Sequence, residues 1–169
     1  EVAVDVNKTS NNVMTRQILL QVAADVMKVP ATIDRARMAV LGWLEQRGLA
    51  FPELVLDNGS GLSRRERMSA AAQVRLLRDA ASSPYADLFR ATLPIVGEDG
   101  TMRHRLRDHP VRGHGWIKTG SLENVRAIAG YVDAASGRRY AVSMLVNSPH
   151  AGASRAAQDE FLRYVYVKG

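Results

Sequence analysis

Cysteine is absent from all 169 residues of the chain, which excludes disulfide frameworks, thiolate catalysis and zinc sites with cysteine ligands. Aromatic residues make up only 6% of the chain and form no stacking platform for nucleic acid. The sequence also lacks a zinc-finger spacing and an Arg-rich recognition helix. The formal net charge of +6 would concentrate polyanions near the surface, but these absences argue against nucleic acid as the partner.

Long apolar runs are missing as well. No stretch approaches the roughly 18 residues of a membrane span, and residues 1–10 lack the basic and apolar regions of a signal peptide. Any export signal is therefore expected to lie upstream or to have been removed. The chain starts at Glu1 without an initiator Met, which suggests a processed product or a piece of a longer protein.

The chain does have enough apolar residues for one core, since 46% of it is hydrophobic, and its length favours a single domain. Apolar residues recur at spacings of three and four before residue 113, which predicts helices. The expected helices are 13–27, 30–47, a segment after Ser63, and a short one from Pro84 that stops before Pro94. Ser63 and Glu66 have the spacing of a capping box, and Gly48 is expected to end the second helix.

From Gly113 onward the pattern changes to the alternation that predicts strands. The expected elements are strands at 116–119, 125–132 and 140–146, followed by a helix at about 154–166. Residues 133–137 have the length and terminal Gly of a hairpin loop, so the second and third strands are predicted to pair. Helices and strands are thus segregated, as in an α/β protein of the α+β type, and so thin a sheet suggests that further strands belong to it.

A Lys-Thr-Gly-Ser run, Lys118–Ser121, ends the first strand-like segment. A strand there places a cationic head, hydroxyl groups and a backbone N–H along one line, which makes an anion-binding edge. Thr119 and Ser121 point to the same face because strand side chains alternate, and Gly120 lets a substrate backbone approach. Three common residues also occur together by chance, so an exposed strand end is the alternative for this triplet alone.

A Ser-x-Asn triplet, Ser10 to Asn12, precedes the first expected helix. Ser and Asn are preferred capping residues, and a cap at Asn11 or Asn12 explains one of them. Capping does not explain why the triplet occurs together with the Lys-Thr-Gly that starts at Lys118. The two are the second and third parts of a known set, Ser-x-x-Lys, Ser-x-Asn and Lys-Thr-Gly.

The chain resembles the D-alanyl-D-alanine carboxypeptidase/endopeptidase family of low-molecular-mass penicillin-binding proteins. The resemblance extends beyond two triplets and covers nearly the whole chain, in the family's order. Its further parts are Asn7-Lys8, Asp57–Arg64, Leu93-Pro94 followed by Gly97, Gly100-Thr101, Ser121-Leu122, Ala129–Tyr131 and Asn147. The most specific part is Gly-Ser-Gly-Leu-Ser-Arg at 59–64, where Asn58 interrupts the family's usual Asp-Gly-Ser-Gly.

This resemblance implies a partial serine β-lactamase/transpeptidase-like fold, with residues 1–169 as the C-terminal part of one domain. Residues 1–112 would form mainly the helical lobe, and residues 113–169 would form three antiparallel strands and the closing C-terminal helix. The resemblance also implies acyl transfer, in which an activated serine attacks the D-Ala-D-Ala carbonyl of a peptidoglycan stem peptide and water releases the acyl-enzyme. β-Lactam antibiotics such as penicillin mimic that substrate.

The resemblance further implies a role for each motif residue. Ser10 would relay a proton to the departing amine, and Asn12 would bond the amide of the substrate. Lys118 would hold Ser10 electrostatically and attract the terminal carboxylate. The Thr119 and Ser121 hydroxyl groups would bind that carboxylate, and the Ser121 N–H would form half of the oxyanion hole.

The nucleophile of the family lies in a Ser-x-x-Lys motif, and no serine of this chain has a lysine three residues later. Ser60 also fails the Gly-x-Ser-x-Gly pattern of a nucleophile elbow. In the family the nucleophile precedes the Ser-x-Asn triplet by a long stretch. The N-terminal remainder of the same protein is therefore expected to supply it, and the chain alone is predicted to be inactive.

Three histidines, His104, His109 and His114, recur every five residues in and beside the Arg-rich segment 103–112. That spacing suits neither a helix face nor a strand face for shared metal ligation, so a solvated basic loop is favoured over a metal site. Neither a metal nor an organic cofactor is expected. Contact with anionic peptidoglycan or a membrane surface remains open for this segment.

The sequence thus predicts the C-terminal part of a periplasmic serine-type D-Ala-D-Ala carboxypeptidase that trims or cleaves peptidoglycan. The alternative is a non-catalytic fragment that binds wall peptide or a partner through its exposed face. A β-lactamase-like hydrolase would need a deacylating Glu, and neither Glu53 nor Glu66 lies in a suitable sequence context.

Overall fold

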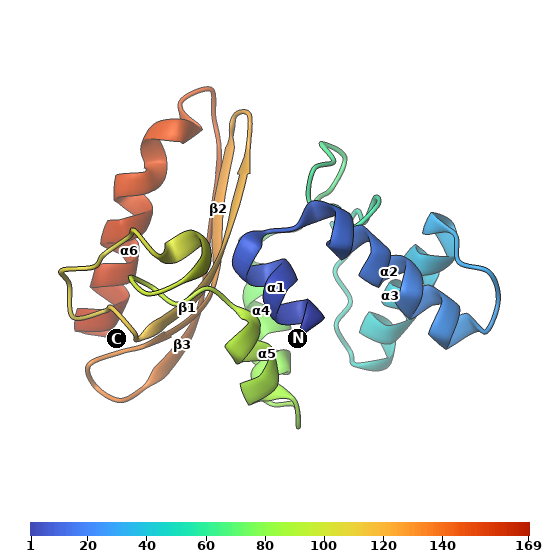
Figure 1. Cartoon of the computed structure of the whole chain (residues 1–169), viewed down its shortest axis with the longest axis horizontal. Coiled ribbons are helices and arrows are strands. Elements are labelled where there is room, and N and C mark those ends of the chain that lie inside the picture. The colour runs from blue at the N-terminus through green and yellow to red at the C-terminus, as the bar shows by residue number, and fades with distance from the viewer. The chain divides into compact units, whose positions relative to one another are not determined.

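The computed structural model describes all 169 residues, which divide into two compact units (Figure 1). The first unit contains residues 1–10 and 73–169, and the second contains residues 11–72. None of the helices combines the length and the apolar character needed to cross a membrane.

Two helices dominate the second unit, α2 (Asn12–Met27) and α3 (Ile33–Gln46). Asn11 caps α2, because its side chain accepts a hydrogen bond from the backbone N–H three positions later. Thr32 caps α3 in the same way, so α3 begins later than the predicted start. Gly48 follows the end of α3 with a φ of 68°, which is the conformation expected of a glycine at a helix C-terminus.

The turn-rich segment 57–63 is a loop, as predicted. The buried Asp57 carboxylate accepts hydrogen bonds from the guanidinium groups of Arg37 and Arg65, at 2.9 and 2.7 Å. A hydrogen bond from the Ser63 side chain, together with these two cations, holds the pKa of the Asp57 carboxyl below its usual value. Asp57 therefore fastens the loop to α3, which carries Arg37.

The capping box predicted at Ser63 and Glu66 is wrong. The Glu66 carboxylate accepts two backbone N–H groups of the loop 57–63, at 3.3 and 3.4 Å. The next helix, α4 (Ala70–Ala81), begins later, and the Ser69 Oγ accepts an N–H of its first turn at 3.0 Å. Ser63 and Ser69 are both residue types that cap helices, and Ser69 is the one directly before the first residue of α4.

A three-stranded antiparallel sheet with the order β1-β2-β3 forms the centre of the first unit (Figure 1). Its strands are β1 (Gly115–Leu122), β2 (Val125–Asp133) and β3 (Arg139–Asn147). Each strand covers one of the strands predicted from alternation, and the hairpin between β2 and β3 is confirmed. The register pairs Ile117 with Gly130 and Lys118 with Ala129.

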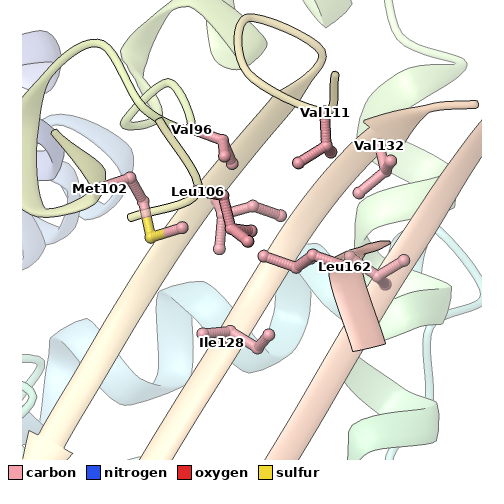
Figure 2. Close-up of a cluster of buried hydrophobic side chains, with 9 residues drawn as sticks. Val96, Met102, Leu106, Val111, Ile128, Val132 and Leu162 are labelled. Atoms are coloured by element: carbon pink, nitrogen blue, oxygen red, sulfur yellow. The ribbon is translucent and has the colours of Figure 1, made fainter. Parts of the chain in front are cut away.

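One face of the sheet carries the main buried core. Helix α6 (Arg155–Lys168) and buried side chains between residues 96 and 111 cover this face. The side chains of Ile128, Val132 and Leu162 belong to this core (Figure 2). The predicted C-terminal helix therefore closes the sheet.

The opposite face carries a second, smaller cluster. Leu77 of α4 packs against Tyr131 of β2, and the Tyr131 hydroxyl donates to the Leu77 carbonyl oxygen at 2.6 Å. Phe89 of α5 (Ala86–Thr92) and Trp116 of β1 pack against the same cluster. Helices thus cover both faces of the sheet, and the α+β class predicted from the sequence is confirmed.

A helix that was not predicted, α1 (Val2–Thr9), opens the chain and belongs to the first unit. Its Val6 side chain is buried, and the Asn7 amide donates to the Thr92 hydroxyl at 2.7 Å. Ser10 ends α1 in a left-handed conformation with a φ of 59°. A helix this short contains too few turns to show an apolar period, which is why the pattern missed it.

Candidate active site

Ser10 and Lys118 come into direct contact in the first unit. Lys118 lies on β1, and its half-buried side chain projects from the face opposite Ile117. Its Nζ donates to the Ser10 Oγ at 2.7 Å and to the Thr119 carbonyl oxygen at 2.8 Å. The end of α1 and the strand β1 therefore bring together two residues that lie 108 positions apart in the chain.

The backbone of Ser10 adopts a conformation that is uncommon for residues other than glycine. Its φ of 59° and ψ of 49° lie in the left-handed region. The Ser10 N–H donates to the Val6 carbonyl oxygen, and the Ser10 Oγ accepts from Lys118. These bonds at backbone and side chain fix the hydroxyl group at the end of α1.

Burial lowers the pKa of the Lys118 ammonium from its ordinary value of 10.5. Desolvation disfavours the charged form, because the protein replaces part of the water around Nζ. In its charged form the side chain has three donors and no acceptor, so it can donate to both the Ser10 hydroxyl and the Thr119 carbonyl and keep one donor for a ligand. Lys118 is thus a desolvated cation aimed at a serine hydroxyl.

We expect Lys118 to titrate below 10.5 in an NMR titration of the chain labelled with ¹³C-lysine. The chain has four lysines, at positions 8, 28, 118 and 168, so the Lys118→Arg variant assigns the signal. Between the folded and unfolded pKa values the unfolded chain binds more protons, so the contribution of this group to the stability rises with pH through that window. A folded-state pKa at or above 10.5 would contradict the desolvation of Nζ.

Thr119 and Ser121 lie on the face of β1 opposite Lys118. The Thr119 hydroxyl donates to the Thr101 hydroxyl at 2.8 Å. Gly120 lies on the Lys118 face, where an added Cβ would contact the Ala127 Cβ at 3.4 Å. The Lys-Thr-Gly-Ser run therefore presents its ammonium on one face and its two hydroxyl groups on the other.

The backbone of β1 also has two edges. The Ile117 N–H donates to the Pro94 carbonyl oxygen at 2.8 Å, so it faces away from β2. Backbone N–H groups alternate along an antiparallel strand, and the N–H of Ser121 therefore faces away from β2 as well. An N–H in this orientation can donate to a ligand that lies along the outer edge of β1.

Asn12 belongs to the second unit, at the start of α2. Its side-chain amide donates to the Ser60 carbonyl oxygen at 2.5 Å, and it lies 3.4 Å from the place of a Cβ at Gly61. The structure thus groups Asn12 with the Gly-Ser-Gly run, the most specific part of the sequence pattern. Ser10, Lys118 and Thr119 are grouped in the first unit.

Three side chains next to the site were not assigned from the sequence. Lys8 lies two residues before Ser10 and forms an ion pair with Asp99, with 2.5 Å between the Lys8 Nζ and the Asp99 Oδ2. Thr101 contacts the Thr119 hydroxyl. Lys8 and Thr101 were already part of the family resemblance, so their recurrence beside the motifs was the signal that could have identified them.

Two of the three histidines in and beside the basic segment pack against the C-terminal helix. The rings of His109 and His114 lie 6.0 and 5.5 Å from the ring of Tyr166. The His109 Nδ1 accepts the Val111 N–H at 3.1 Å. No three His, Asp or Glu side chains gather where they could hold a metal ion.

Sequence comparison supports the resemblance that the motifs carry. The chain matches the D-Ala-D-Ala carboxypeptidase 3 (S13) family over residues 1–165. It is 33% identical over 165 residues to the D-alanyl-D-alanine carboxypeptidase of Actinomadura sp. strain R39, covering 94% of this chain and 30% of that protein. It is 30% identical over 166 residues to the D-alanyl-D-alanine carboxypeptidase DacB of Haemophilus influenzae, covering 94% of this chain and 35% of that protein. The chain thus spans about a third of the length of these relatives.

Solved structures show the same relationship. The crystal structure of penicillin-binding protein 4 (DacB) from Haemophilus influenzae, complexed with a β-lactam, matches with a TM-score of 0.87 and 29% identity. The match covers 98% of this chain and 40% of that one. A class A β-lactamase from Bacteroides cellulosilyticus, 21% identical, matches with a TM-score of 0.54 over 79% of this chain and 52% of that one, and it shows the fold alone. The predicted partial transpeptidase-like fold is confirmed, and the chain belongs to the D-Ala-D-Ala carboxypeptidase 3 (S13) family.

Proposed function

We propose that this chain is the proton-relay and carboxylate-binding part of a serine-type D-Ala-D-Ala carboxypeptidase. The whole enzyme would hydrolyse peptidoglycan stem peptides in the periplasm through an acyl-enzyme. The observation that carries this proposal is the 2.7 Å hydrogen bond from the Lys118 Nζ to the Ser10 Oγ. It links the Ser-x-Asn and Lys-Thr-Gly motifs in one polar pair, and membership of the family supplies the reaction class.

Ser10 is proposed to relay the proton. The Lys118 ammonium donates to the Ser10 oxygen, which leaves the Ser10 hydroxyl proton for the departing amine. As Ser10 gives up that proton, its oxygen can take one from the attacking serine. The positive charge of Lys118 favours this exchange, because it stabilises negative charge that develops on the Ser10 oxygen.

The strand β1 is proposed to hold the C-terminal end of the substrate. Lys118 attracts the terminal carboxylate, and the hydroxyl groups of Thr119 and Ser121 would bind it where it lies along the outer edge of the strand. The Ser121 N–H, which faces away from β2, is proposed as one donor of the oxyanion hole. Asn12 would bond the substrate amide, as the family resemblance implies.

A serine outside these 169 residues is proposed as the nucleophile, since no serine of the chain has a lysine three residues later. The N-terminal remainder of the same protein would supply it within a Ser-x-x-Lys motif. β-Lactam antibiotics would acylate that serine. The structure of the Haemophilus influenzae relative in complex with a β-lactam supports this part of the proposal.

Labelled penicillin tests this function. The purified chain is expected to take up no stable label. A chimera in which residues 1–169 replace the matching 40% of the Haemophilus influenzae protein, here termed the DacB chimera, is expected to be labelled and to release D-Ala from a stem pentapeptide. Prior incubation with unlabelled penicillin should block both signals. Stable labelling of the chain alone, or a folded chimera with neither signal, would contradict the proposal.

A non-catalytic role in binding wall peptide is the second candidate, and the absence of a Ser-x-x-Lys motif favours it. It predicts that the chain alone binds a peptide ending in D-Ala-D-Ala, as chemical shift changes in NMR spectra would report, while the DacB chimera remains unlabelled. A labelled chimera would exclude a purely binding role.

A further inference from the structure

Three consecutive residues, Asp99 to Thr101, contact chain neighbours of both Ser10 and Lys118 within the first unit. Asp99 contacts α1, since its Oδ2 accepts from the Lys8 Nζ at 2.5 Å. Its other oxygen, Oδ1, accepts the Ile95 N–H at 2.7 Å. The carboxylate thus joins the last turn of α1 to the backbone that leads into the 99–101 segment.

Gly100 brings the same segment against the backbone of α1. Its φ is 52°, and an added Cβ would lie 2.7 Å from the Lys8 carbonyl oxygen and 3.1 Å from the Pro94 Cβ. The first neighbour is backbone of α1 and the second is a fully buried proline ring, so neither is the end of a flexible side chain. Only a glycine therefore permits this approach, and the approach sets the position of a residue two places before Ser10.

Thr101 completes the connection on the side of β1. Its Oγ1 lies 2.8 Å from the Oγ1 of Thr119, the residue next to Lys118. Asp99 and Gly100 thus contact α1 just before Ser10, and Thr101 contacts β1 just after Lys118. The relay pair lies between two contacts made by one short segment.

We propose that Asp99-Gly100-Thr101 is a positioning segment that sets the distance between the Ser10 hydroxyl and the Lys118 ammonium. Its catalytic meaning rests on the proposed function, because a relay depends on that distance. The Lys8–Asp99 ion pair is part of the device, with Lys8 and Asp99 side chains that are 17% and 35% exposed. Partial burial leaves such a pair less screened by solvent and salt than a fully exposed one.

A glycine pair gives the sharpest test. Gly100→Ala adds a Cβ against the Lys8 carbonyl, whereas Gly137→Ala adds one at a φ of 83° in the β2–β3 loop, with nothing within 4 Å. In the ¹³C-lysine-labelled chain, the nuclear Overhauser effect between the Ser10 β protons and the Lys118 ε protons is expected to be lost in Gly100→Ala. It should persist in Gly137→Ala, although both variants acquire a left-handed alanine. Persistence in a folded Gly100→Ala chain would overturn the proposal.

Lys8 provides a second test that adds no steric conflict. Lys8→Met, which removes the ion pair, is expected to weaken the same signal, and Lys8→Arg, which can still pair with Asp99, is expected to retain it. The proposal would be overturned if both variants retained the signal, and also if both lost it to the same extent. A dispersed amide spectrum verifies folding in every variant.

The positioning role and the proposed function can fail independently, because the nuclear Overhauser effect between Ser10 and Lys118 requires no acylation. If the DacB chimera is labelled by penicillin while the Gly100→Ala and Lys8→Met signals are unchanged, the positioning role alone fails. If the signals change as expected while the chimera is never labelled, the proposed function alone fails.

Discussion

Lys118→Ala is expected to lower the rate of penicillin acylation of the DacB chimera by about 10³-fold. The substitution removes the cation that donates to the Ser10 Oγ and that is proposed to attract the substrate carboxylate. It removes the proton-relay partner and a preorganised charge together, and such charges act most strongly where water is partly excluded. Time courses of labelling at several penicillin concentrations measure the effect.

Lys168→Ala is the matched control for this variant. Lys168 is an exposed lysine in the last turn of α6, 50 residues after Lys118. Its replacement by alanine changes the net charge by the same amount as Lys118→Ala. Its acylation rate should equal that of the unmodified chimera. A Lys118→Ala chimera that is acylated at the unmodified rate would remove Lys118 from the mechanism.

The hydrogen bond between Ser10 and Lys118 also predicts how their substitutions combine. Residues that act as one unit show strong non-additivity, so the Ser10→Ala/Lys118→Ala chimera should be about as slow as Lys118→Ala alone. Two independent roles would instead multiply the two losses. The double variant therefore distinguishes one relay pair from two separate contributions.

The sheet and the longer helices could be predicted because their signals are local. Alternation over β1 to β3 and apolar spacing over α2 and α3 reflect which face of each element is buried. The capping box failed because Ser63, Glu66 and Ser69 are all plausible near a helix start, and contacts of Glu66 with the loop backbone decided between them. A local sequence pattern predicts that a helix exists more reliably than it predicts the residue at which the helix begins.

The site was less accessible from the sequence. The motifs identified Ser10 and Lys118, and the structure places their side chains in contact, while the catalytic role of each residue stays a prediction. The Lys8–Asp99 pair joins residues 91 positions apart and follows no periodic pattern. The contact between Thr101 and Thr119 depends on a short 3₁₀ turn, Gly100–Met102, that brings a loop hydroxyl to β1. Such contacts follow from tertiary packing, which residue spacing does not encode.

Gly130→Ala is expected to lower the free energy of unfolding by about 4 kcal/mol. Gly130 lies in β2, the central strand, opposite Ile117 of β1. An added Cβ would overlap the Trp116 carbonyl oxygen and lie 3.0 Å from the Trp116 carbonyl carbon and 3.1 Å from the Ile117 Cα. All three atoms belong to the backbone of a paired strand, so relief requires β1 to separate from β2. Urea denaturation followed by circular dichroism measures the loss.

Gly137→Ala separates this steric conflict from the cost of the alanine itself. The added Cβ has nothing within 4 Å, so this variant should lose only about 1 kcal/mol, the cost of a left-handed alanine. Equal losses in the two variants would contradict the close approach of β1 to Gly130.

The steric conflict in Gly130→Ala also falls at Trp116 and Ile117, the two residues before Lys118. If the Gly130→Ala chain still folds, the displacement of β1 should therefore move Lys118 away from Ser10. The nuclear Overhauser effect between the Ser10 β protons and the Lys118 ε protons should then weaken.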